Sequence, residues 1–166
     1  MYRFGTILLG ISLTLAMPVG AARETVGWVE KVRVYPGNVL LKAKIDSGAK
    51  TSSLHCDFAS VIERNGKQWV AFTVINYKGE LIKLEKKLER LSKIKRHFGE
   101  VQERYVIKLG ICLGQTYKET EVNLIDRSGM NYQILIGRRF LKGSHVIDPA
   151  LTFASKPNCI RPEDRE

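Results

Sequence analysis

The sequence predicts an all-β domain that contains one short helix. Apolar and polar residues alternate through much of the chain, which is typical of strands with one buried face. Turn signals rich in glycine and asparagine separate these stretches. Residues 134–136 are apolar throughout, as expected of a strand buried on both faces, and Gly137 ends this strand before a single helical turn.

Residues 1–21 are predicted to be a signal peptide. Residues 1–3 form a positive head, residues 5–17 an uncharged apolar run, and small residues lead to a cleavage site near Ala21. The apolar run is shorter than the roughly 20 residues that a membrane-spanning helix needs, so we expect no stable membrane anchor. The mature chain is expected in the bacterial periplasm or outside the cell.

Residues 22–166 suffice for one domain with a substantial core, but not for two large lobes. The formal charge of the whole chain is +10, and Arg3 is the one charged residue of the predicted signal peptide, which leaves +9. Basic and acidic residues are interspersed, and no aromatic-rich nucleic-acid motif accompanies them. A solvated basic surface is therefore favoured over a polyanion site, and no nucleic-acid partner is expected.

The three cysteines are Cys56, Cys112 and Cys159. An exported protein can form one disulfide from them, and all three pairings remain open. Neither the cysteines nor the three histidines show metal-ligand spacing, so we expect no metal and no cofactor.

Two hairpins are predicted in the first half of the mature chain. Residues 28–34 have even apolar spacing up to a turn at 36–38, and residues 39–45 then alternate apolar side chains with lysines. The second hairpin turns at Asn65 and Gly66, a dipeptide that suits a tight turn.

Residues 81–96 are ambiguous. Their leucines recur at helical spacing with charges between them, which taken alone indicates an amphipathic helix. The flanking turn signals and strand-like neighbours leave extended structure open. From residue 101 the strand pattern returns in short pieces, separated by Gly110, Gly114 and a turn at 126–129.

Asp46 is the candidate catalytic residue. It follows the strand of residues 39–45 and precedes a small-residue turn. Ser47 and Gly48 place hydroxyl and backbone donors beside the carboxylate, and Gly48 lacks the Cβ that would keep another chain away. When this dipeptide is taken alone, an aspartate that opens an ordinary turn is the favoured explanation.

Two segments together resemble the retropepsin-like aspartic peptidases, which combine an Asp-Ser/Thr-Gly-Ala loop with a later apolar-apolar-Gly-Arg segment. The strings KIDSGAKTSSLHC, RYVIKLG, ILIGRRFL and VIDPALTF further resemble a bacterial family labelled ATP-dependent zinc protease and more recently treated as retropepsin-like endopeptidases. The resemblance covers about residues 27–153.

The resemblance implies a small closed β-barrel that works as a homodimer. Two carboxylates a few ångströms apart cannot both ionise, so one keeps a proton while the other activates water. Because each chain has one such loop, the second Asp46 must come from a symmetry-related copy. Asp46 and its mate would act as general base and general acid.

The resemblance also assigns supporting roles. Ser47 and Thr51 would hydrogen-bond the acid pair, Gly48 would keep the approach open, and Ala49 would lie at the cleft wall. Gly137 and Arg138 would brace the loop from below, although fold maintenance explains these supporting residues equally well.

His55 and Arg104 match positions characteristic of this bacterial family, and together with Lys50 they are the candidate substrate-binding residues. Lys50 is expected to point toward solvent or substrate, since a cation turned inward would oppose a shared proton. Cys56 stands where the family usually has a small residue. A Cys-His catalyst is not favoured, because neighbouring strand residues point to opposite faces.

The family label is not carried over, since no phosphate-cradling loop and no zinc ligand set occur. Some relatives are associated with ATP-grasp ligases and act on glutamate-rich tails. A basic cleft would suit such an acidic substrate by analogy alone, and the predicted export weakens this analogy.

The sequence thus predicts an exported aspartic endopeptidase acting on a peptide or protein. A non-catalytic peptide-binding adaptor or sensor of the cell envelope is the alternative, and a polyanion-binding protein ranks last.

Overall fold

The computed structural model describes residues 22–95 and 101–164. The predicted signal peptide, and His97 among the histidines, lie outside the described residues. The elements in chain order are β1 (Glu24–Tyr35), β2 (Val39–Ile45), β3 (Ser52–His55), β4 (Asp57–Arg64), β5 (Lys67–Ile75), β6 (Leu81–Lys87), β7 (Arg90–Lys95), β8 (Val101–Leu113), β9 (Thr116–Ile125), β10 (Ile134–Ile136), α1 (Arg138–Leu141), β11 (His145–Thr152) and the 3-10 turn η1 (Pro162–Asp164).

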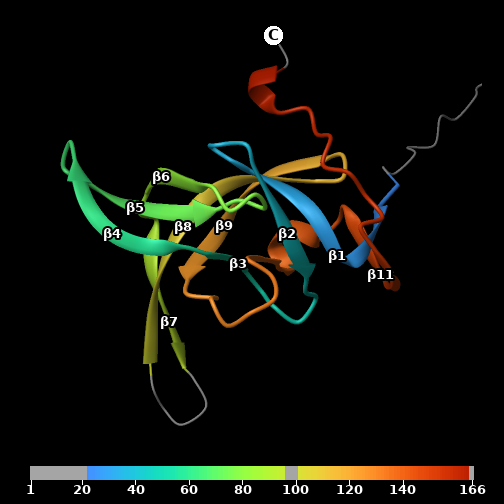
Figure 1. Ribbon diagram of the computed structural model, residues 1–166, viewed down its shortest axis with the longest axis horizontal. Coiled ribbons are helices and arrows are strands. Elements are labelled where there is room, and N and C mark those ends of the chain that lie inside the picture. Colours follow the sequence, from blue (N-terminus) through green and yellow to red (C-terminus); the bar gives the residue numbers. More distant parts are fainter. Residues whose placement is uncertain (1–21, 96–100, 165–166) are drawn as a thin grey trace, which may run out of the picture.

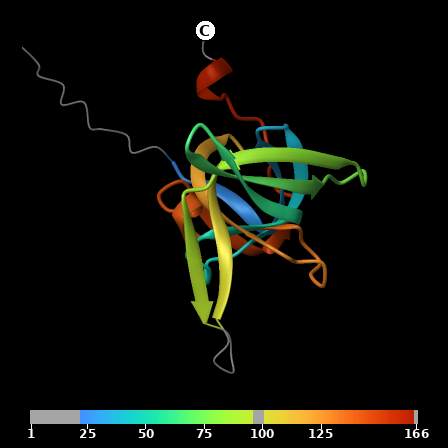
Figure 2. The ribbon, with the colours of Figure 1, turned by 90° about the vertical axis from the view of Figure 1, so that its left-hand side faces the viewer.

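Six strands form a closed barrel in the order β1, β2, β10, β3, β9 and β8, with β8 pairing back onto β1 (Figure 1). Strand β11 adds to β1, and β7 adds to β8. Strands β4, β5 and β6 form a separate antiparallel sheet, and the β7–β8 hairpin projects beyond the barrel (Figure 2). The predicted all-β fold with a small closed barrel and one short helix is therefore confirmed.

The barrel interior is filled by the apolar residues of the alternating patterns. The side chains with 0–1 % exposure include Val32, Leu41, Leu54, Ile107, Leu109, Ile134 and Phe140. Because side chains alternate across a strand, the lysines between them on β2 face solvent.

Both predicted hairpins are confirmed. Strands β1 and β2 pair antiparallel around residues 36–38, where Gly37 and Asn38 have positive φ. Strands β4 and β5 pair around Asn65 and Gly66, which also have positive φ, as a tight hairpin turn requires.

Over the described residues 81–95, the helical interpretation of residues 81–96 is wrong, because they supply strands β6 and β7. Strand β6 completes a ladder with β5, and β7 completes one with β8. Leu84 is buried while Leu81 and Leu91 are exposed, so the leucines do not share one buried face. Pairing with available strand edges decided the structure here, and helical spacing did not.

Gly110 does not interrupt the chain as predicted, because β8 runs through it without a break. A Cβ at Gly110 would lie 2.3 Å from the Tyr117 hydroxyl oxygen of the adjacent strand. This glycine therefore makes room for an aromatic side chain and does not mark a turn.

Of the three open cysteine pairings, the structure contains Cys112–Cys159, and Cys56 is free and buried. The bond joins β8 to the segment that follows β11. Within the described residues, no helix is long and apolar enough to cross a bilayer.

Candidate active site

The two motif segments are neighbours in the barrel, although about 90 residues separate them. Strands β2 and β10 pair in parallel, with Ile136 opposite Ile45. The backbone N–H of Asp46 extends this ladder by donating to the Ile136 carbonyl at 2.9 Å. The ladder therefore sets the position of Asp46 relative to the segment that begins at Gly137.

The Asp46 carboxylate is held by its own loop. Its Oδ1 accepts hydrogen bonds from the backbone N–H of Gly48 at 2.8 Å and of Ala49 at 3.2 Å. A Cβ at Gly48 would lie 3.0 Å from this oxygen. Lys44 Nζ lies 3.9 Å from Oδ2, and the Asp46 side chain is 24 % exposed. The acid is therefore fixed in direction and remains open to a ligand.

Arg138 braces this loop from the start of α1. Its guanidinium donates to the carbonyls of Ser47 at 2.8 Å and Gly48 at 2.7 Å. Its backbone N–H donates to the Ala49 carbonyl at 2.9 Å. A charged donor shared by two carbonyls is stronger than a neutral bond, so one side chain ties the turn to the helix.

Gly137 allows the loop and α1 to approach closely. A Cβ at this position would lie 2.8 Å from the Thr51 carbonyl carbon and 3.0 Å from the Ala49 carbonyl oxygen. The Gly137 N–H also donates to the Ser52 hydroxyl at 3.1 Å. Since the neighbouring atoms belong to the backbone, a side chain here would displace the loop.

Ser47 and Lys50 contact α1 through their backbone carbonyls, which accept from the Arg138 guanidinium and the Arg139 N–H respectively. Ser47 and Lys50 are exposed, and Thr51 is half-buried. Within residues 22–95 and 101–164, neither the Ser47 nor the Thr51 hydroxyl bonds to Asp46. Their role in an acid pair stays a prediction.

The His55 side chain lies against the backbone of Arg127 and does not face an open cleft. It is buried, and its Nδ1 accepts the backbone N–H of Arg127 at 2.9 Å. Carboxylate oxygens of Asp57 and Asp126 lie 3.7 Å from Nε2 and Nδ1 respectively. The imidazole thus orders the chain at Arg127, and a direct substrate contact from it is not favoured.

Arg127 is the residue that sequence reasoning missed. Its side chain donates to the Tyr132 carbonyl at 3.1 Å and to the Ser53 hydroxyl at 3.1 Å, and the residue is 7 % exposed. Burial lowers the pKa of Arg127, and Arg104 lowers it further, whereas Asp46 raises it. An arginine inside a turn signal gives no indication that it will be buried.

Arg104 approaches the same region from β8. It is half-buried, and its guanidinium donates to Gln102 Oε1 at 2.8 and 3.1 Å. The charges of Arg104 and Asp46 both act on the Arg127 guanidinium, so Arg127 lies within electrostatic reach of each of these two residues.

A second basic feature adjoins the loop. A cleft of about 540 Å³ is lined by Arg23, Ser47, Arg138, Leu141, Lys142, Gly143, His145 and Ile147. Its lining contains three cationic side chains and no carboxylate.

Cys56 is unsuited to nucleophilic chemistry. Burial, followed by the charges of Asp57 and Asp126, raises the pKa of its thiol to about 12. Because the thiolate is the reactive form, this position does not support a Cys-His catalyst.

The chain is similar to proteins that carry the same domain. The family model described as retropepsin-like aspartic endopeptidase RimB matches residues 25–158. A probable alpha-L-glutamate ligase of Shewanella halifaxensis is 35 % identical over 116 residues, which are 68 % of this chain and 25 % of that protein. A protein of the same name from Desulfotalea psychrophila is 32 % identical over 117 residues, or 69 % of this chain and 25 % of the relative. The chain therefore spans about a quarter of the length of these relatives.

A solved structure shares the fold. The crystal structure of Lpg0085, a Legionella pneumophila protein with unknown function, has a TM-score of 0.71 and 34 % sequence identity. The match covers 81 % of this chain and all of that one. The relatives' names refer to glutamate ligation and not to the zinc-protease label. The chain belongs to the RimB-like family of retropepsin-like aspartic endopeptidases.

Proposed function

We propose that this protein is an exported aspartic endopeptidase whose active site forms from two copies of the Asp46 loop in a homodimer. The observation that carries the proposal is the carboxylate of Asp46, held by Gly48 and Ala49 in a loop that Arg138 braces. One chain supplies one such carboxylate, and a second copy would supply the other.

The chemistry follows from the pair. One Asp46 carboxylate would take a proton from a water molecule, which attacks the peptide carbonyl carbon, while the protonated partner stabilises the developing oxyanion. The resulting tetrahedral intermediate breaks its C–N bond as the leaving nitrogen receives a proton from the pair. The pair then returns to its singly protonated state.

We propose an acidic peptide, rich in glutamate, as the substrate class. Arg104, half-buried on β8, would receive a substrate carboxylate with the Arg127 guanidinium behind it, since guanidinium groups form strong charge-assisted hydrogen bonds to carboxylates. Among residues 22–95 and 101–164, no carboxylate forms an ion pair with Arg127. The names of the matched ligases concern glutamate and support the same class by analogy.

Asp46→Asn tests the catalytic assignment. Mature protein incubated with peptide libraries between about pH 4 and 7 is expected to cleave, and the variant is expected to lose at least about 100-fold in rate while it keeps its fold. Asp164→Asn is the matched control, because Asp164 lies on η1 and pairs with Arg161. Unchanged cleavage by Asp46→Asn would exclude the proposal, and a monomer that binds peptides without cleavage would favour the adaptor.

Arg104→Gln tests the substrate class. We expect kcat/KM for a glutamate-rich peptide to fall about tenfold, the equivalent of about 1.4 kcal/mol. For the matched peptide with glutamine in place of glutamate, kcat/KM should change less than twofold. An equal loss on both peptides would remove Arg104 from charge recognition.

A further inference from the structure

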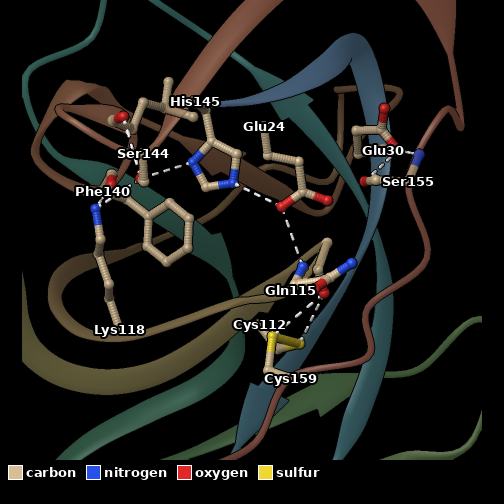
Figure 3. A network of polar contacts seen from close by, with 12 residues as sticks. Glu24, Glu30, Cys112, Gln115, Lys118, Phe140, Ser144, His145, Ser155 and Cys159 are labelled. Carbon is tan, nitrogen blue, oxygen red and sulfur yellow. Dashed lines mark hydrogen bonds and ion pairs between the residues drawn. A yellow bond between two sulfur atoms is a disulfide. The ribbon is translucent and has the colours of Figure 1, made fainter. Parts of the chain in front are cut away.

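One lysine outside the loop holds the far end of α1. Lys118 lies on β9, and its ammonium reaches the turn between α1 and β11 (Figure 3). We propose that Lys118 is a positioning residue of the active site, acting on the Asp46 loop through α1 and Arg138. This inference rests on the proposed function.

All three ammonium donors of Lys118 are used. They donate to the Phe140 carbonyl at 2.7 Å, the Lys142 carbonyl at 3.2 Å and the Ser144 hydroxyl at 2.7 Å. The two carbonyls lie at the C-terminal end of α1, where helix carbonyls lack partners within the helix. Lys118 therefore acts as the cap of this end, and its charge complements the negative end of the helix.

The helix cannot hold this geometry alone. It has four residues and no side-chain N-cap, whereas isolated helices need roughly 12 residues to be even marginally stable in water. The Phe140 ring is fully buried, with Lys118 Nζ 5.5 Å from its centroid and the His145 ring stacked at 5.6 Å. Tertiary contacts at this end consequently determine where α1 lies.

Displacement of this end would reach the catalytic loop. Arg138 begins α1 two residues before Phe140, and its guanidinium bonds to Ser47 and Gly48. A shift of one ångström at a catalytic group can cost about 100-fold in rate. Lys118 and Asp46 are thus joined by a short series of contacts, with Arg138 in the middle.

Partial burial of Lys118 disfavours the charged form of its ammonium group. The residue is half-buried, and burial lowers its pKa. Among the residues that the structure describes, no carboxylate forms an ion pair with it, so carbonyl dipoles and the Phe140 ring balance the charge. Methionine at this position would preserve most of the packing but none of the three hydrogen bonds. The Lys118→Met variant therefore separates the effect of the hydrogen bonds on α1 from the effect of side-chain packing.

The experiment compares Lys118→Met and Lys118→Arg with the control Lys83→Met, which removes the same charge from an exposed position on β6. Lys118→Met is expected to lower kcat about 10- to 100-fold with KM within twofold, and Lys118→Arg should recover part of kcat. Hydrogen exchange provides a second readout. The amides of Arg138 and Arg139, which donate to the Ala49 and Lys50 carbonyls, should exchange faster in Lys118→Met, while barrel amides keep their rates.

The exchange measurement needs no substrate, so it tests positioning even where no peptide is cleaved and separates this inference from the proposed function. Unchanged exchange at Arg138 and Arg139 in Lys118→Met would overturn the inference. A loss of kcat equal in Lys118→Met and Lys83→Met would also overturn it.

Discussion

His145 shows how a single buried side chain makes stability depend on pH. Its Nδ1 lies 2.9 Å from the Ser144 hydroxyl, and its Nε2 lies 3.8 Å from Glu24 (Figure 3). Burial lowers the pKa of His145 from 6.5, and the charge of Lys118 lowers it further. A hydrogen bond with the Leu113 backbone and the charge of Glu24 raise the pKa but do not offset the burial. The folded protein therefore binds this proton less readily than the unfolded chain does.

The sign of the effect follows from this difference. As pH falls below 6.5, the unfolded chain takes up the proton first, so folding stability decreases by at most about 1.4 kcal/mol per pH unit. We predict that Tm falls between pH 6.5 and 5, before most carboxylates titrate. His145→Asn, whose amide can retain the Ser144 contact, should flatten this part of the Tm curve. An identical slope in the variant would contradict the assignment to His145.

Single residues also show what sequence can reveal. Asp46, Gly137 and Arg138 could be selected because their neighbours in sequence form recognisable strings. Arg127 and Lys118 could not, because their partners are backbone carbonyls and hydroxyls that come near only through the barrel. In a sequence, an isolated basic residue looks the same whether its side chain is exposed to solvent or bonded to backbone carbonyls inside the fold.

At the scale of elements, the site is a junction of β2, β10 and α1. Arg138 contributes two charged hydrogen bonds to the packing of the loop on α1, and because both are exposed to solvent we expect about 2 kcal/mol from the two together. Glu121 of β9 further links α1 to the β7–β8 hairpin, since it pairs with both Arg139 and Arg90. The same strand that supplies Lys118 therefore also contacts the hairpin that carries Arg104.

We predict that Arg138→Met lowers kcat at least about tenfold and destabilises the protein by about 2 kcal/mol, because two carbonyls lose a charged donor. Peptide kinetics and urea unfolding measure the two effects. Arg33→Met is the control, since Arg33 makes an exposed bond to Asn38 at the opposite end of β2. Full activity in Arg138→Met would show that β10 alone positions the loop.

Elements were predictable where local signals agreed. Asn65 and Gly66 specify their hairpin by backbone preference alone. Residues 81–96 were not decidable, because whether β6 and β7 form depends on open edges at β5 and β8. No property of the segment itself contains that information.

At the scale of the whole molecule, the disulfide ties residues 47 positions apart. By loop-closure entropy, a link of this length is worth about 4 kcal/mol. We predict that the double change of Cys112 and Cys159 to serine lowers the unfolding free energy by up to that amount in urea titrations. Cys56→Ala leaves the disulfide intact, and it should lower the unfolding free energy by no more than a small truncation of a core side chain does. Equal stability of the double variant and the unaltered chain would show that the bond is not formed.

Glu30 gives the molecule a further dependence on its last segments. This carboxylate is fully buried on β1 and accepts the N–H groups of Gly27, Ala154 and Ser155 together with the Ser155 hydroxyl. Three of these four donors come from residues made more than 120 positions later. Until residue 155 has been synthesised, β1 lacks three of the four donors that hold the Glu30 carboxylate in the folded barrel. We therefore expect a chain that ends before residue 154 to leave its early strands accessible to proteases, because a buried carboxylate without its donors destabilises the barrel.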